Sequence, residues 1–492
     1  MLFNSLDFLL FFPIVVFCYY LIPNRFKHFG LLAASYYFYM SWNARYGLLI
    51  LFCTACTYLC GLLIEKYRKV SESKKRIYTA VCIVLTLSVL AYFKYTGFAL
   101  GTLERILNRI GIAWKTPAVD IVLPVGISFF TFQAISYVID VYRGDIYAEK
   151  DFFRYALFVS FFPQLVAGPI ERSRNLLKQL ATPQKFSYEN AREGLLLMLW
   201  GYFLKMVIAD RAAIFVDAIY ANTFEYQGWF TIVATALFAI QIYCDFSGYS
   251  VIAIGAAKVL NIHLMENFES PYLSESVSEF WRRWHISLTS WFKDYLYIPL
   301  GGSKKGMLRK HFNRIIVFLV SGLWHGAEWS FVAWGGLNGL YQVLGDILKP
   351  FRDKAVQIFS LNRDSIGHKC IRIIVTNILI CISWVFFRSD SISESFRVIA
   401  GMLTASNPQI LVDGSLFAHG LDQPNFNLLL WSIGILFFAD FCKKRGIAVR
   451  KIILGQDYWV RWLIFSLSVS AILLFGIWGI AYDATNFIYF QF

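Results

Sequence analysis

Two histidines in aromatic segments are the side chains of this sequence best suited to chemistry. The first, His325, lies in SGLWHGAEWSFVAWGGLNG (Ser321–Gly339), beside Trp324 and between Gly322 and Gly326. An ionisable group at membrane depth is costly and faces the protein interior or a wet cavity. Imidazole also accepts a proton near neutral pH. We therefore predict that His325 is a general base. The competing interpretation is a structural histidine, hydrogen-bonded in a polar helix core.

The second histidine, His285, lies in FWRRWHISLTSWFKDYLYIPLGG (Phe280–Gly302), within a stretch from about 261 to 311 that is too polar to span a membrane in one pass. Tryptophan and arginine are typical of a helix at a membrane interface, and Arg282 or Arg283 could also bind a phosphate or carboxylate. The interfacial interpretation does not account for His285. We predict that this imidazole is a second polar group of the catalytic site.

Two further segments carry polar residues inside apolar runs. In QIYCDFSGYSVIAIGAAKVL (Gln241–Leu260) we predict a polar network that shapes a cavity, because an aspartate at membrane depth needs a partner. A Ser-His-Asp triad is the weaker alternative, since the serine lacks the G-x-S-x-G context. Pro and Gly breaks around LPVGISFFTFQAISYVIDVYRG (Leu123–Gly144) fit helices that line a passage. Two residues near His325 could stabilise an oxyanion. The candidates of these two segments and of the His325 segment are Asp245, Ser247, Tyr249, Gln133, Trp324 and Asn338.

Several familiar motifs are missing from the sequence. It contains no GxxxxGK[ST] nucleotide loop and no H-E-x-x-H zinc motif. The HxxxxD acyltransferase motif is also missing, because Ser290 stands five residues after His285. Nine cysteines occur, and CTACTYLC (Cys53–Cys60) holds one CxxC, but no second CxxC or histidine pair completes a metal set. We therefore predict small packing residues, with neither a disulfide nor a metal.

The elements that must position these residues are membrane helices. The 492 residues are 58% hydrophobic and 16% charged, whereas soluble proteins carry about 25% charged residues. The mean hydropathy of +0.53 agrees. We predict an all-α polytopic membrane protein with roughly 11–13 crossings of about 20 residues each, some of them tilted or re-entrant. The predicted spans lie near 7–22, 29–41, 45–64, 78–100, 120–140, 153–170, 193–209, 229–246, 313–323, 329–347, 371–388, 427–442 and 461–482.

The net charge of +14 comes from short basic segments between the apolar runs. This is the positive-inside pattern of cytoplasmic loops near anionic lipid, and it argues against nucleic-acid binding. The segment 65–76 holds six Lys or Arg and is predicted to be cytoplasmic. Counting back three spans places the N-terminus outside. The first apolar run has no basic n-region and no cleavage site, so it is predicted to be a retained span rather than a signal peptide.

In order along the chain, these segments resemble the membrane-bound O-acyltransferase (MBOAT) family, in particular its bacterial alginate O-acetylation branch. The resembling stretches are YFKYTGF (Tyr92–Phe98), LPVGISFFTFQAISYVIDVYRG, FFPQLVAGPIERSRNLLKQL, YCDFSGYSVIAIGAAKVL, FWRRWHISLTSWFKDYLYIPLGG and SGLWHGAEWSFVAWGGLNG. The resemblance implies one integral membrane domain over 1–492, with a family core at about 92–345 and additional helices at about 371–482. It implies a ring of transmembrane and re-entrant helices around a tunnel.

The resemblance also implies a function. His325 maps onto the family's catalytic histidine and His285 onto a second conserved one. The implied reaction transfers an acetyl or other short acyl group to hydroxyls of an exported polysaccharide, directly or through an exported acetylesterase-like partner, in a bacterial cytoplasmic membrane. The donor is an acyl thioester such as acetyl-CoA, or an acyl carrier protein, and no bound cofactor is expected.

Two alternatives stay open at this stage. D-alanyl transfer to teichoic acid is the first; the long C-terminal part after His325 favours the acetylation branch over it. A transporter or flippase is the second and weaker one, because it predicts inverted repeats and gives no reason for the His325 motif.

Overall fold

The computed structural model describes residues 1–117, 121–166 and 168–478, and these residues form helices and no strand. The chain makes two compact units. The first consists of Met1–Leu195 with Ala253–Met265, and the second of Leu196–Ile252 with Glu266–Phe492. Two helices, α9 and α11, contribute residues to both units.

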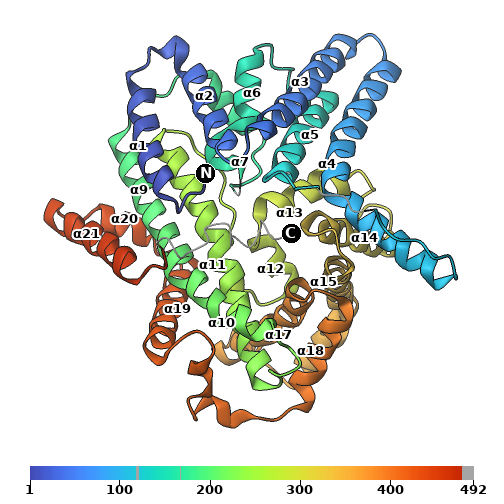
Figure 1. Ribbon diagram of the computed structural model, residues 1–492, viewed down its shortest axis with the longest axis vertical. Helices are drawn as coiled ribbons and strands as arrows, with labels where there is room; N and C mark the ends of the chain where they lie inside the picture. Colours follow the sequence, from blue (N-terminus) through green and yellow to red (C-terminus); the bar gives the residue numbers. More distant parts are fainter. Residues whose placement is uncertain (118–120, 167, 479–492) are drawn as a thin grey trace. The chain divides into compact units, whose positions relative to one another are not determined.

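The first unit begins with a series of antiparallel helices (Figure 1). Its elements are α1 (Leu6–Leu21), η1 (Asn24–Phe26), α2 (Lys27–Met40), α3 (Ala44–Tyr67), α4 (Glu72–Arg109), α5 (Ile127–Arg143), α6 (Phe152–Ser160), α7 (Phe162–Leu165), α8 (Ser173–Ala181) and the start of α9 (Tyr188–Tyr202).

The hairpin of α3 and α4 shows why these residues form packed helices. Ser71 caps α4 by accepting a hydrogen bond from Lys74 N, so the chain turns sharply between the two helices. The buried residues of α4 are Thr79, Cys82, Thr86 and Leu90. Their spacing of three or four residues places them on one helix face. Small side chains on such a face allow membrane helices to approach closely.

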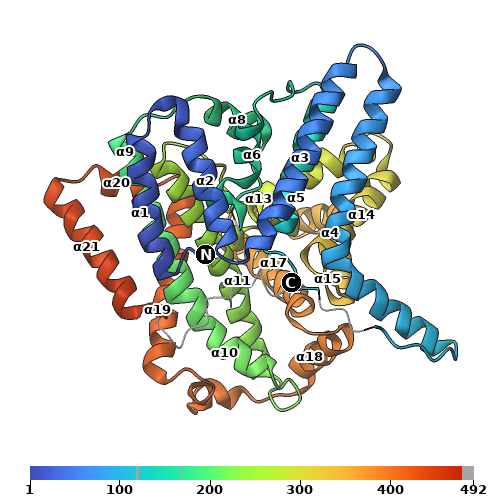
Figure 2. The same cartoon turned by 45° about the horizontal axis from the view of Figure 1, so that its top comes forward.

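The second unit holds the remaining helices (Figure 2). Its elements are η2 (a π-helix, Phe203–Ala209), α10 (Asp210–Tyr220), α11 (Trp229–Val259), η3 (Pro271–Leu273), α12 (Val277–Arg283), α13 (Ile286–Phe292), η4 (a π-helix, Lys293–Tyr297), α14 (Met307–His325), α15 (Trp329–Ile347), α16 (Lys349–Ile358), α17 (Ile366–Arg388), α18 (Ile392–Thr404), η5 (Pro408–Leu411), η6 (Ser415–Ala418), α19 (Gln423–Lys444), α20 (Val449–Leu454) and α21 (Tyr458–Phe475).

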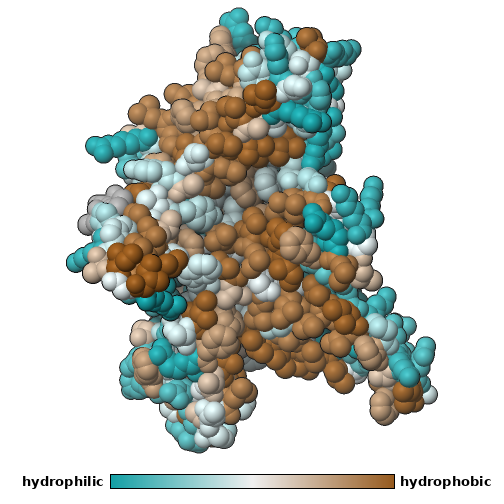
Figure 3. All heavy atoms as spheres, turned by 90° about the vertical axis from the view of Figure 1, so that its right-hand side faces the viewer, coloured by the Kyte–Doolittle hydropathy of each residue, from teal (hydrophilic) through white to brown (hydrophobic). Residues whose placement is uncertain are grey.

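Six of the described helices are long and apolar enough to cross a membrane: α3, α4, α11, α17, α19 and α21. Large hydrophobic side chains are exposed on five of these helices, whereas α11 is mostly buried. Hydrophobic residues cover wide areas of the face drawn in Figure 3. The protein is therefore a helical, multi-pass membrane protein, as the sequence predicts. The total of 11–13 crossings stays a prediction.

Several predicted spans are shorter or interrupted in the structure. The segment predicted as 153–170 is divided, because α6 ends at Ser160 and the short α7 begins at Phe162. The segment predicted as 193–209 changes from α9 into the π-helix η2. Residues 120, 167 and 479–482 of the predicted spans lie outside the described residues.

Candidate active site

The helix hairpin of α14 and α15 fixes the position of His325, the last residue of α14. Gly322 and Gly335 let the two helices touch: a Cβ on Gly322 would lie 2.2 Å from the carbonyl oxygen of Phe331, and one on Gly335 would lie 2.2 Å from that of Phe318. Any side chain at either position would push the helices apart. The group that approaches Gly322 is the backbone of α15.

Aromatic rings enclose the imidazole of His325, which is only 6% exposed. Its ring centroid lies 4.9 Å from that of Trp324, 5.1 Å from that of Trp334 and 5.6 Å from that of Phe387 on α17. Three elements of the second unit thus surround one titratable group. Such walls exclude water and strengthen the electrostatic interactions of the group they enclose.

His285 joins the same cluster from the start of α13. Its ring lies 6.4 Å from that of His325 and 6.0 Å from that of Trp324, centroid to centroid. Phe246 of α11 packs edge-on against it at 4.6 Å. The backbone of His285 is left-handed (φ 45°, ψ 55°), a conformation that costs energy in a non-glycine residue. The structure therefore brings together the two histidines that the sequence singled out.

Asn267 holds His285 in place. Its Oδ1 lies 3.1 Å from Nδ1 of His285 and accepts hydrogen bonds from the backbone N (3.2 Å) and Oγ (2.9 Å) of Ser287. Its Nδ2 donates to Oγ of Ser250 at 2.9 Å. Because a carboxamide oxygen only accepts, this contact selects the tautomer of His285 with the proton on Nδ1. Nε2 is then the basic nitrogen.

The buried environment also sets the charge of His285. This residue lies outside the six long apolar helices, and burial lowers the pKa of its imidazole to about 3. The ring is therefore neutral at pH 7, which agrees with the tautomer that Asn267 selects.

The Asn267→Ala variant is expected to lose about 1–2 kcal/mol of stability, because Asn267 also supplies the capping acceptor for the first turn of α13. Asn267→Asp retains an acceptor at the same place, but it buries a carboxylate and removes the Nδ2 donor to Ser250, so it is expected to lose at least as much stability. Thermal unfolding of the two variants in detergent tests this. Equal melting temperatures for the alanine variant and the wild type would contradict the assigned role.

Asp245, Ser247 and Tyr249 lie buried on α11. Asp245 has the partner that its depth demands: its Oδ1 lies 2.6 Å from Nζ of Lys205, which also lies 2.8 Å from Oδ1 of Asp210. Nζ of Lys205 is 6.0 Å from the ring centroid of Tyr249. Two ion pairs therefore join Asp245 and Asp210 to one buried lysine, Lys205.

Among the remaining candidates, Arg283 and Asn338 have structural contacts. Arg282 is exposed, and Arg283 forms an ion pair with Glu279 at 2.9 Å. Oδ1 of Asn338 accepts from the indole nitrogen of Trp281 at 3.1 Å. Its Nδ2 donates to the carbonyl oxygen of Trp334 at 2.9 Å, so Asn338 supports the ring that packs on His325.

Gln133 lies in the first unit. Its Nε2 donates to the carbonyl oxygen of Phe158 at 2.6 Å, and its Oε1 accepts from Nε2 of Gln164 at 2.8 Å. These two contacts join α5 to α6 and α7.

Four side chains near the predicted candidates escaped the sequence-based prediction: Asn267, Ser250, Ser287 and Lys205. The first three are short polar residues with no spacing signal, and they meet only because α11 and α13 pack around Asn267. Lys205 did carry a signal, since it stands inside the predicted span 193–209, where a charge requires a partner.

The model of the MBOAT, membrane-bound O-acyltransferase family, matches residues 149–387. A probable alginate O-acetylase AlgI of Azotobacter vinelandii is 37% identical, over 82% of this chain and 78% of the relative. The peptidoglycan O-acetyltransferase of Helicobacter pylori is 31% identical, over 94% and 91%. A teichoic acid D-alanyltransferase of Streptococcus thermophilus is 27% identical, over only 45% and 56%.

Proposed function

The chain belongs to the membrane-bound O-acyltransferase family, and from this premise we propose that it transfers an acetyl group from a thioester donor to hydroxyls of an exported polysaccharide. The observation that carries this proposal is the pair of buried histidine rings, 6.4 Å apart, inside one aromatic cluster. The relatives named for O-acetylation match most of this chain, whereas the D-alanyltransferase matches less than half of it.

His325 is the general base of the proposed reaction. The hydroxyl oxygen of the acceptor attacks the thioester carbonyl carbon while its proton passes to the imidazole. The C–S bond then breaks, and the leaving sulfur takes the proton from the imidazolium. The aromatic walls around His325 keep out water, which would otherwise hydrolyse the thioester. His285, held neutral and oriented by Asn267, is the second polar group of this site.

The donor approaches from the cytoplasmic side of the cell membrane, where the basic segments attract an anionic thioester such as acetyl-CoA. With segment 65–76 on that side, the N-terminus is extracytoplasmic. The acceptor is the polysaccharide itself or an exported acetylesterase-like protein that passes the acetyl group on.

Membrane vesicles that contain the chain test the proposal when they are supplied with acetyl-CoA labelled in the acetyl group. The expected product is a labelled, alkali-labile ester on an acceptor polysaccharide, and vesicles without the chain are the control. A parallel assay supplies a labelled D-alanyl carrier protein. Transfer of D-alanine without transfer of acetate would contradict the proposal and favour the alternative.

A further inference from the structure

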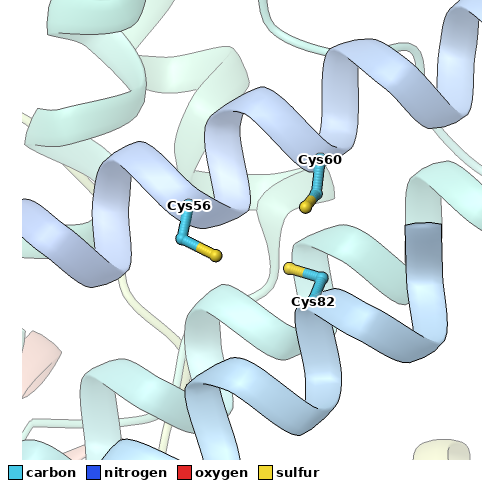
Figure 4. Close-up of side chains that lie close together, drawn as sticks. All are labelled: Cys56, Cys60 and Cys82. Atoms are coloured by element: carbon cyan, nitrogen blue, oxygen red, sulfur yellow. The ribbon is translucent and has the colours of Figure 1, made fainter.

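Three cysteine thiols meet between α3 and α4 in the first unit (Figure 4). The sulfur atoms of Cys56, Cys60 and Cys82 all lie within 4.8 Å of one another, and all three are free thiols. Their side chains point toward one another across the two helices. The CxxC spacing in the sequence pairs Cys53 with Cys56, whereas the structure leaves Cys53 out of the group and adds a sulfur from a second helix.

Helix geometry explains why this group forms. Cys56 and Cys60 are four residues apart on α3 and therefore occupy one face. Cys82 belongs to the buried stripe of α4 and is 1% exposed. Two cysteines at i and i+4 therefore face a third sulfur donor on the neighbouring helix. These three sulfur atoms can bind one metal ion without a movement of the backbone.

We propose that these three cysteines form a site for a monovalent soft metal ion, Cu(I). Sulfur donors select Cu(I), Zn²⁺ and iron–sulfur clusters among biological metals. Structural Zn²⁺ sites use four protein ligands, and the described residues group only three potential ligands here. Three sulfurs suffice for Cu(I).

The site lies inside the helix pair, away from the polar turn that joins α3 and α4. Cys60 lies seven residues before the end of α3 and Cys82 lies ten residues after the start of α4, so the site is about 10–15 Å along the helices from the polar turn. Cysteines bind metal ions as thiolates, so each cysteine that coordinates Cu(I) releases its thiol proton on binding, and the copper does not change its oxidation state.

The test is a competition for copper between the purified full chain in detergent and a coloured Cu(I) chelator, bicinchoninate, without oxygen. The wild type is expected to remove a single equivalent of Cu(I). Loss of an outer-shell partner already costs about 10–100-fold in metal affinity, so Cys56→Ser, Cys60→Ser and Cys82→Ser are each expected to weaken binding by at least about 100-fold. Cys53→Ser is the matched control, since Cys53 is buried on the same helix outside the group.

A second measurement needs no variant. The X-ray absorption spectrum of the copper-loaded wild type is expected to show three sulfur neighbours around Cu(I). Two neighbours, unchanged binding in any of the three variants, or equal loss in Cys53→Ser would overturn the proposal. So would a disulfide between two of the three cysteines in protein isolated without reductant.

Discussion

Replacement of His325 by alanine is expected to lower acetyl transfer by about 10²–10⁴-fold, the contribution of a positioned general base. The variant removes the imidazole from the end of α14 and leaves the α14–α15 contact at Gly322 and Gly335 unchanged. The readout is the acetyl content of the exported polysaccharide, with membrane levels of the protein measured in the same cells.

His263→Ala is the matched control, because His263 is exposed on a different segment and takes no part in the proposed reaction. His285→Ala belongs in the same series and is expected to lower transfer as well, since His285 shares the aromatic cluster with His325. Full acetylation in His325→Ala, at normal protein abundance, would contradict the proposed mechanism and would favour a structural role for this histidine.

Lys205→Met is expected to destabilise the protein by about 3–5 kcal/mol, which is typical when one partner of a buried ion pair is removed. Nζ of Lys205 contacts Asp210 and Asp245, and all three side chains are at least 95% buried. Without the ammonium group, two carboxylates face each other in an apolar interior. Thermal unfolding in detergent and protein abundance in membranes measure the loss.

Neutralising the whole group provides the control for this prediction. The triple variant Lys205→Met, Asp210→Asn, Asp245→Asn removes every charge of the cluster and is expected to recover most of the lost stability. If the triple variant is as unstable as Lys205→Met alone, the shape of the lysine side chain, rather than charge compensation, holds these helices together.

The sequence was informative where an ionisable residue stands in an apolar segment, because such a residue requires a partner or a function. The sequence singled out His325 and His285 because an imidazole in an apolar segment is costly, and the structure brings their rings together, while their catalytic role stays a prediction. Asp245 was expected to have a partner, and it has one. The identity of that partner could not be predicted, since Lys205 is 40 residues away on a π-helix. Asn267 could not be predicted either, because a single asparagine in a polar segment forms no periodic pattern that would show where its side chain points.

The helices themselves followed from hydrophobic segments, but their breaks did not. Pro163 lies at the start of α7, and the neighbouring Phe161 leaves the helical conformation, which divides one apolar run into two elements. A hydropathy profile does not detect such a break, because the side chains stay apolar while the backbone changes direction. The meeting of Cys82 with Cys56 and Cys60 was missed for a similar reason: it depends on the register of two helices.

The discontinuous first unit has a consequence for the order in which the protein is made. Its fold uses residues 253–265: Asn190 donates to Asn261 at 2.6 Å, Gln179 donates to the carbonyl oxygen of His263 at 2.8 Å, and Glu171 accepts from Met265 N. Synthesis runs from the N-terminus, so these contacts form only after the ribosome has also made residues 196–252 of the second unit. A fragment that stops at residue 195 lacks these contacts. The first unit is therefore complete only when the chain has been translated through residue 265.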